Sequence, residues 1–160
     1  MTLGGGSIAH FNLTAQHACC SNCSRLVSFD GAEVSYLDLQ SCRNVDLSTL
    51  ASVRGLVNLQ IVGSGPVVTD FGFATRCREL KNLTITTVHN TADFSALGRV
   101  PALGSAFLVV RRKLLAQVAG DFPHLVLSNG DVGFRGSQEM SHFDFERERT
   151  AALGVPYLPL

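Results

Sequence analysis

The sequence predicts an α/β fold assembled from repeats, in which short strands stack on one another and share one core. Three observations favour this fold. A motif of the form apolar-x-x-apolar-x-apolar recurs at spacings of 22 and 24 residues. The second half of each unit also recurs, as an aspartate followed by leucine or phenylalanine. Finally, the chain has 160 residues, of which 46% are apolar, and this is enough to bury a substantial core.

Three copies of the motif match it fully, and they begin at Val34, Leu56 and Leu80. Alternate residues of a strand point to opposite faces, so each copy presents two apolar side chains to the same side. These inward pairs are Leu37 with Leu39, Leu59 with Ile61, and Leu83 with Ile85. One unit cannot bury its own apolar face, so we expect at least about three units to stack into ladders.

Degenerate copies of the motif extend the repeat in both directions. They are Ile8-x-x-Phe11-x-Leu13, Leu103-x-x-Ala106-x-Leu108, Phe122-x-x-Leu125-x-Leu127 and a last, capping copy at Met140-x-x-Phe143-x-Phe145. In the second half of each unit, the recurring aspartates are Asp46, Asp70 and Asp93. Val53, Cys77 and Val100 then fill one equivalent apolar position, three residues before the next unit.

The unit that begins at Leu103 lacks the aspartate step and has residues 111–122 in its place. Leu114, Leu115 and Val118 are spaced for one face of a short helix. Residues 128–138 are glycine-rich and predict a loop. Residues 142–149 alternate like an exposed strand, but they also pair charges as a short helix would. Residues 154–160 contain two prolines and predict an extended segment.

The stretch LDLQSCRNVDLSTLAS resembles the short leucine-rich repeat of internalin-type and protozoan proteins. VTDFGFATRCRELKNLTI resembles the cysteine-containing repeat of F-box-associated proteins. The resemblance implies a right-handed solenoid with a short-stranded parallel sheet on its concave side and an irregular or helical convex side. It also implies binding rather than catalysis. We expect a flexible leader at 1–7, about five to six repeats at 8–128, and a C-terminal cap and extended tail at 129–160.

Charge and cysteine content restrict the setting of the chain. Thirteen basic and thirteen acidic residues give a net charge of zero, and only 16% of residues are charged. This excludes a basic chain that wraps nucleic acid and favours a subunit covered by partners. No apolar run approaches the ~20 residues of a membrane-spanning helix. Five cysteines without a recognisable secretory signal predict a reducing, intracellular and cytoplasmic setting.

The residues between the inward leucines define a candidate partner surface, because the repeat geometry turns them to the concave face. The middle of this face is polar and its C-terminal third is apolar, which indicates a contact with a partner or with the chain's own tail. Ordinary solvated strand residues are the alternative. The candidate contact residues are Tyr36, Asp38, Gln40, Asn58, Gln60, Asn82, Thr84, Thr86, Phe107, Val109, His124 and Val126.

The cysteines form a cluster at Cys19, Cys20 and Cys23, which with His17 offers metal-ligand residue types. A structural zinc site needs four ligands and no second Cys-x-x-Cys pair exists, so we favour buried packing instead. Cys42 stands where a side chain satisfies the turn after a strand. No catalytic arrangement can be assembled, and we expect neither an enzyme nor a cofactor.

The sequence therefore favours a non-catalytic protein–protein interaction scaffold that is a structural subunit of a larger assembly. One alternative is a substrate-recognition adaptor of a ubiquitin ligase, whose F-box a separate chain would supply. Another is a component of a ribonucleoprotein particle, in which the basic run Arg111, Arg112 and Lys113 contacts RNA.

Overall fold

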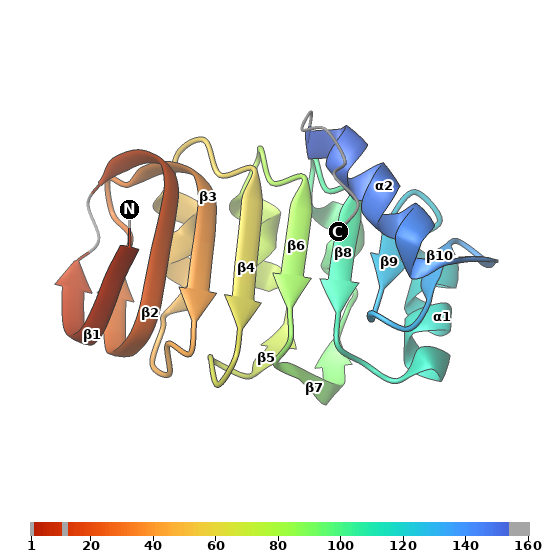
Figure 1. Ribbon diagram of the computed structural model, residues 1–160, viewed down its shortest axis with the longest axis horizontal. Coiled ribbons are helices and arrows are strands. Elements are labelled where there is room, and N and C mark those ends of the chain that lie inside the picture. The colour runs from red at the N-terminus through yellow and green to blue at the C-terminus, as the bar shows by residue number, and fades with distance from the viewer. Residues whose placement is uncertain (1, 11–12, 154–160) are drawn as a thin grey trace.

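The computed structural model describes residues 2–10 and 13–153, with side chains described at residues 2, 13–25 and 28–151. Within that part, the chain is mixed α/β, with a nine-stranded sheet in the order β1-β2-β3-β4-β6-β8-β9-β10-β11 (Figure 1). The sheet is parallel from β1 to β9, and β10 and β11 complete it in antiparallel fashion. Its strands are Thr2–His10, Thr14–Ser28, Glu33–Gln40, Asn58–Val62, Asn82–Ile85, Ser105–Leu108, Val126–Ser128, Gly133–Arg135 and Gln138–Met140.

The central strands stack their apolar residues in register, as the three full copies of the motif predict. One ladder joins Leu37, Leu59, Leu83 and Ala106, and a second joins Leu39, Ile61, Ile85 and Leu108. All eight side chains are at most 1% exposed. Each buried leucine or isoleucine contributes roughly 1.5–3 kcal/mol relative to exposure, so these ladders carry much of the core.

The recurring aspartates start the return segments of the repeats. The Oδ1 atoms of Asp46, Asp70 and Asp93 accept hydrogen bonds from the backbone N–H two residues later, at 3.0, 2.9 and 2.8 Å. The 3₁₀ helices η1 (Leu47–Ser52), η2 (Gly72–Arg76) and η3 (Leu97–Arg99) follow these turns. The equivalent apolar positions Val53, Cys77 and Val100 are buried. The aspartate step is therefore a turn device that brings the chain back to the sheet.

The two α-helices lie on opposite sides of the sheet (Figure 1). Helix α1 (Arg112–Asp121) buries Leu115 and Val118 on the side of the leucine ladder, as the spacing predicts. Helix α2 (His142–Leu153) settles the open alternative for residues 142–149 in favour of a helix. Its start is capped by Ser141, whose Oγ accepts from the Asp144 N–H at 3.1 Å and donates to the Asp144 carboxylate at 2.8 Å.

The C-terminal cap differs from the sequence prediction in two ways. Residues 128–138, expected as a loop, contain strand β10 and lead into β11, and these two strands pair antiparallel. The capping copy at Met140, Phe143 and Phe145 is wrong, because Phe143 and Phe145 lie in α2. Ion pairs three residues apart, Arg147 with Asp144 at 2.9 Å and Arg149 with Glu146 at 3.2 Å, favour the helix there. The extended tail expected at 154–160 lies outside the described residues.

The N-terminal region also differs from the sequence prediction. Thr2–His10, which includes most of the expected leader, form β1 and pair with β2. The copy at Ile8, Phe11 and Leu13 is wrong as a ladder strand, because Ala18 and Cys20 of β2 stand beside Leu37 and Leu39. Small residues occupy the inward positions there, and a template built on large aliphatic residues misses them. Phe11 itself lies outside the described residues.

A second, two-stranded parallel sheet joins β5 (Val68–Asp70) to β7 (Val88–Asp93).

Neither α1 nor α2 is long and apolar enough to cross a membrane, and the same holds for every helix in the described part of the chain.

Candidate functional site

The side chains opposite the leucine ladder form a second surface of the sheet, which we call the open face. Two rows of neighbouring residues cross it from β2 to β9. The first row is His17, Tyr36, Asn58, Asn82, Ser105 and Val126, and the second is Cys19, Asp38, Gln60, Thr84, Phe107 and Ser128. Most of the candidate contact residues thus lie side by side.

The N-terminal end of the open face is polar and exposed. His17 Nε2 lies 2.7 Å from Asp38 Oδ2, and the His17 side chain is 58% exposed. The Tyr36 ring stands edge-on to the His17 ring, with their centroids 6.4 Å apart. Gln40 is exposed at the end of β3. This end offers hydrogen-bonding groups and an aromatic ring to solvent.

The middle of the open face carries neutral polar side chains that are buried. Asn58, Asn82 and Thr84 are each less than a tenth exposed. Ser105 Oγ donates a hydrogen bond to Asn82 Oδ1. Among the described residues, no partner reaches Asn58 Oδ1, Asn82 Nδ2 or Thr84 Oγ1. An unpaired buried polar group costs about 1–3 kcal/mol, so a ligand that supplies hydrogen bonds to this row would gain affinity from it.

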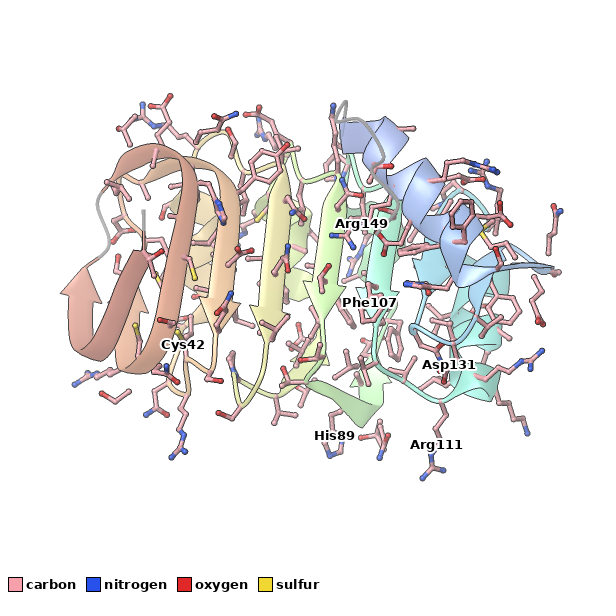
Figure 2. The ribbon with its side chains drawn as sticks, in the orientation of Figure 1. Cys42, His89, Phe107, Arg111, Asp131 and Arg149 are labelled. Atoms are coloured by element: carbon pink, nitrogen blue, oxygen red, sulfur yellow. The ribbon has the colours of Figure 1, made fainter. Side chains whose placement is uncertain are left out.

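The apolar C-terminal third is covered by the chain itself. Helix α2 crosses β9 and β10 on the open face, in front of the sheet (Figure 1). Phe107 lies beside the start of α2 (Figure 2), with its ring centroid 6.1 Å from that of His142. The His142 ring stacks on Phe145 at 5.9 Å, and its Nδ1 lies 3.1 Å from Ser128 Oγ. Helix α2 thus covers Phe107 and Val126 of this third, whereas Val109 stays 46% exposed. The tail expected from the sequence as one of two occupants lies outside the described residues.

Burial beneath α2 is tight. Val126 is 5% exposed and Phe145 is fully buried. At Gly133 in β10, a Cβ atom would lie 3.3 Å from Phe145 Cβ and 2.8 Å from Met140 Cγ, so glycine permits this close approach. His142 and Phe145, which pack α2 against the open face, were not predicted from the sequence. Their spacing of three residues, continued by Arg149, is the helical signal that could have found them.

Besides Gln40 at the end of β3, three candidate residues lie beside the rows rather than in them. Thr86 follows β6, and its Oγ1 accepts a hydrogen bond from the Gly63 N–H at 3.2 Å. Val109 follows β8 and is 46% exposed. His124 precedes β9 and packs edge-on against Phe122, because Leu127 rather than Leu125 stands beside Ala106. The copy of the motif that begins at Phe122 is therefore displaced by two residues from its expected pairing.

The cysteine cluster is part of the packing. Cys20 fills an inward ladder position, and the Cys42 thiol donates a hydrogen bond to the Cys20 carbonyl at 3.2 Å. Burial raises the pKa of Cys20 to about 12 and the pKa of Cys23 to about 11. Both therefore stay protonated at neutral pH, whereas metal ligands and nucleophiles are thiolates. No group of three or more His, Cys, Asp or Glu side chains that could hold a metal ion is found in the part of the chain described.

The basic run is partly committed to an internal ion pair. Arg112 Nη2 lies 2.6 Å from Glu139 Oε2 of β11, which ties the start of α1 to the edge of the sheet. Arg111 and Lys113 are exposed beside it.

Comparison of the chain with protein-family models, with curated proteins and with solved structures finds no match to any of them. Function therefore has to be inferred from the chemistry of the surfaces themselves.

Proposed function

We propose that this chain is a non-catalytic protein–protein interaction scaffold, built as a leucine-rich-repeat solenoid, and that it is a structural subunit of a larger intracellular assembly. The open face is the concave side of that solenoid. A partner protein lies on its polar rows between β2 and β6, beside the third of the face that α2 covers.

The observation that carries this proposal is the unpaired polar row in the middle of the open face. Asn58 Oδ1, Asn82 Nδ2 and Thr84 Oγ1 lack partners among the described residues, and Gln60 is half-buried between them. These atoms are buried in the free chain, so a partner segment would pair with them by displacing the half-buried side chains beside them, such as Gln60. Burying a polar group without a partner is unfavourable, so the row favours a bound state in which it is paired.

The chemistry of the rows also indicates the kind of contact. In the two rows, the ionisable acid and base described are Asp38 and His17, which contact each other. The remaining hydrogen-bonding side chains of the rows are mainly amides and hydroxyls. Binding would then depend on shape and hydrogen bonds rather than on long-range charge, and it would change little with ionic strength.

Co-purification tests the proposal: the full chain is tagged in its native cell and purified gently with whatever it binds. We expect a reproducible, near-stoichiometric set of proteins with the wild type, identified by mass spectrometry. The double variant Tyr36→Lys, Gln60→Lys places two charges on half-buried positions of the open face and should lose that set. Gln117→Lys, on the exposed surface of α1, is the matched control and should keep it.

Thermal unfolding of each variant separates lost binding from lost folding. Lysine at Asn58 or Asn82 is avoided because both side chains are buried, and a charge there would unfold the chain. Partners retained by the folded double variant would place the binding site elsewhere. A lone, monodisperse wild-type chain would contradict the subunit role.

A further inference from the structure

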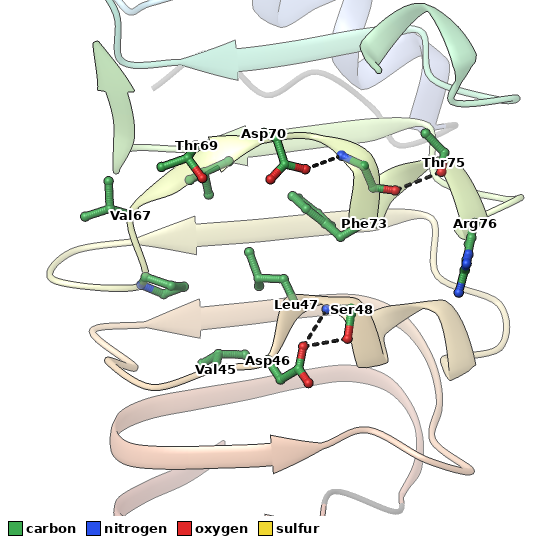
Figure 3. A pocket seen from close by; sticks show the side chains of 13 residues that line it. Val45, Asp46, Leu47, Ser48, Val67, Thr69, Asp70, Phe73, Thr75 and Arg76 are labelled. Atoms are coloured by element: carbon green, nitrogen blue, oxygen red, sulfur yellow. Dashed lines mark hydrogen bonds between the residues drawn. The ribbon is translucent and has the colours of Figure 1, made fainter. Parts of the chain in front are cut away.

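A groove of about 550 Å³ lies on the opposite side of the molecule from the open face, between two successive return segments (Figure 3). One wall is the start of η1 and the other is β5 with the chain that leads into it. The lining residues include Asp46, Leu47, Val67, Thr69, Asp70 and Phe73.

The repeat lengths explain why the groove exists. The recurring aspartate follows the last inward residue of the strand by seven positions in one unit, from Leu39 to Asp46. In the next unit the interval from Ile61 to Asp70 is nine positions. The two additional residues lie in the segment that contains Gly63 and Pro66. The longer segment does not pair with the shorter one, and a gap remains between them.

Strand β5 presents an unpaired edge to this groove. Its other edge pairs with β7, where the Val68 N–H donates to the Thr87 carbonyl at 2.8 Å. In a parallel pair, alternate residues direct their backbone groups to the same neighbour. The N–H and C=O groups of Val67 and Thr69 therefore point away from β7, toward the groove. Such an edge is a template for one more strand.

The groove is lined by apolar side chains, by two carboxylates, Asp46 and Asp70, and by one cation, Arg76. Leu47 and Phe73 are half-buried between its walls, and Val67 is 60% exposed, the highest fraction among the large hydrophobic side chains described. Asp46 and Asp70 lie on opposite walls of the groove, with Leu47 and Phe73 between them (Figure 3). Each carboxylate uses Oδ1 to accept from its own turn. No ion pair to either is found among the described side chains.

We propose that an extended segment of a partner protein binds in this groove by adding a strand to β5. Its backbone pairs with Val67 and Thr69, an apolar side chain packs over Leu47 and Phe73, and a lysine or arginine reaches the carboxylate of Asp46 or Asp70. Charge complementarity favours a basic segment, because the groove is lined by two carboxylates, Asp46 and Asp70, and by a single cation, Arg76. Strand addition of this kind takes affinity from main-chain hydrogen bonds and specificity from the side-chain pockets. This second interface is independent of the open face.

Hydrogen exchange on the full chain tests the unpaired edge directly. We expect the Val68 amide to exchange slowly, because it is bonded within the two-stranded sheet, and the Thr69 amide to exchange fast. A Thr69 amide that is already protected in the free chain would overturn the proposal, since the edge would then be occupied.

A random library of 12-residue peptides, selected against the full chain, tests the ligand chemistry. We expect enriched peptides to alternate apolar residues around a lysine or arginine, and a synthetic copy to slow exchange at Thr69. Thr69→Pro removes the N–H that points into the groove and should weaken that peptide about tenfold. Asp46→Asn with Asp70→Asn should weaken it several-fold and reduce its salt dependence. Gln117→Lys, on the exposed surface of α1, should leave it unchanged.

Three results would overturn the proposal. One is a library with no enrichment, and another is enriched peptides that bind the groove variants as tightly as the wild type. The third is a dimer in sedimentation that Val67→Lys dissociates, because the groove would then belong to a second copy of the chain. If Thr69→Pro fails to fold, the exchange measurement on the wild type with and without peptide still decides.

Discussion

The first row of the open face has two ends that differ in chemistry, although both belong to the same parallel sheet. At β2 the row begins with His17, which is exposed and bonded to Asp38. At β9 it ends with Val126, which is buried under α2. The chain covers the apolar end with its own helix and leaves the polar end uncovered by any described helix. Hydrophobic burial decides where the helix sits, and the remaining polar rows are what the molecule has to offer a partner.

The largest expected effect comes from the ladder that both ends share. Leu59→Asp places a charge at a fully buried position between Leu37 and Leu83. We expect the free energy of unfolding to fall by about 4 kcal/mol or more, which removes most of a typical domain's stability. Circular dichroism with heating measures it. Gln60→Asp, one residue along on the open face, is the control and should cost less than about 1 kcal/mol. An unchanged melting temperature for Leu59→Asp would show that the strand register is wrong.

The next effect concerns the covered end alone. Phe145 is fully buried beneath α2, so Phe145→Ala should cost about 3–5 kcal/mol by urea unfolding. Phe143 in the same helix is 53% exposed, and Phe143→Ala should stay within about 0.5 kcal/mol. Equal costs for the two variants would break the comparison, because α2 would not be the cover of the apolar end.

The ladder strands and the aspartate turns could be predicted from the sequence, and the ends could not. Large aliphatic residues at fixed spacing mark β3, β4 and β6, and their burial follows from alternation alone. At β2 the inward positions hold Ala18 and Cys20, which carry too little apolar surface to outweigh Phe11 and Leu13 in a sequence template. Backbone pairing, which a template does not contain, decides the register there.

At β9 the displacement is two residues, so each side chain keeps its face even though its neighbour changes. This is why Leu125 and Leu127 are buried as the motif predicts, whereas His124 leaves the row. The candidate face was largely predictable for the same reason. The helix that covers part of this face could not be predicted, because the sequence of residues 142–149 fits either a strand or a helix. The ion pairs and the Ser141 cap that favour the helix exist only in the folded chain. The groove beside β5 depends on two additional residues in the segment that precedes it. The number of residues between motifs does not show whether such a segment pairs with its neighbour.

The cysteines of β2 provide a pH test of the uncovered end. Burial raises the pKa of Cys20 from its ordinary value of 9.0 to about 12. The folded chain therefore retains a proton that the unfolded chain loses above pH 9. Stability is complete below pH 9 and falls as the pH rises from 9 toward 12, by about 1 kcal/mol for this thiol at pH 10. Urea unfolding at pH 8 and pH 10 measures the fall.

Cys20→Ala is the matched variant, and it should remove the contribution of Cys20 but leave those of Cys23 and Cys77, whose pKa values burial raises to about 11. Thiol labelling of the native chain at pH 8 gives a second readout. Cys19 is the one cysteine of the five that is not buried, so it should react first. Burial and the nearby Asp38 carboxylate raise its pKa as well, so the reaction should be slower than with a free thiol. Fast labelling of Cys20 would show that β2 is not packed into the ladder.

The smallest expected effects come from replacing the residue at each end of the first row by alanine, which compares the two ends directly. Val126→Ala removes buried apolar surface and should cost about 1–2 kcal/mol. His17→Ala removes the contact of an exposed ring with Asp38 and its edge-on packing against Tyr36, and should cost about 0.2–1 kcal/mol, less in high salt. A double-mutant cycle with Asp38→Ala isolates that pair. If His17→Ala costs as much as Val126→Ala, the polar end is buried in solution as well, and a cover other than α2 must lie on it.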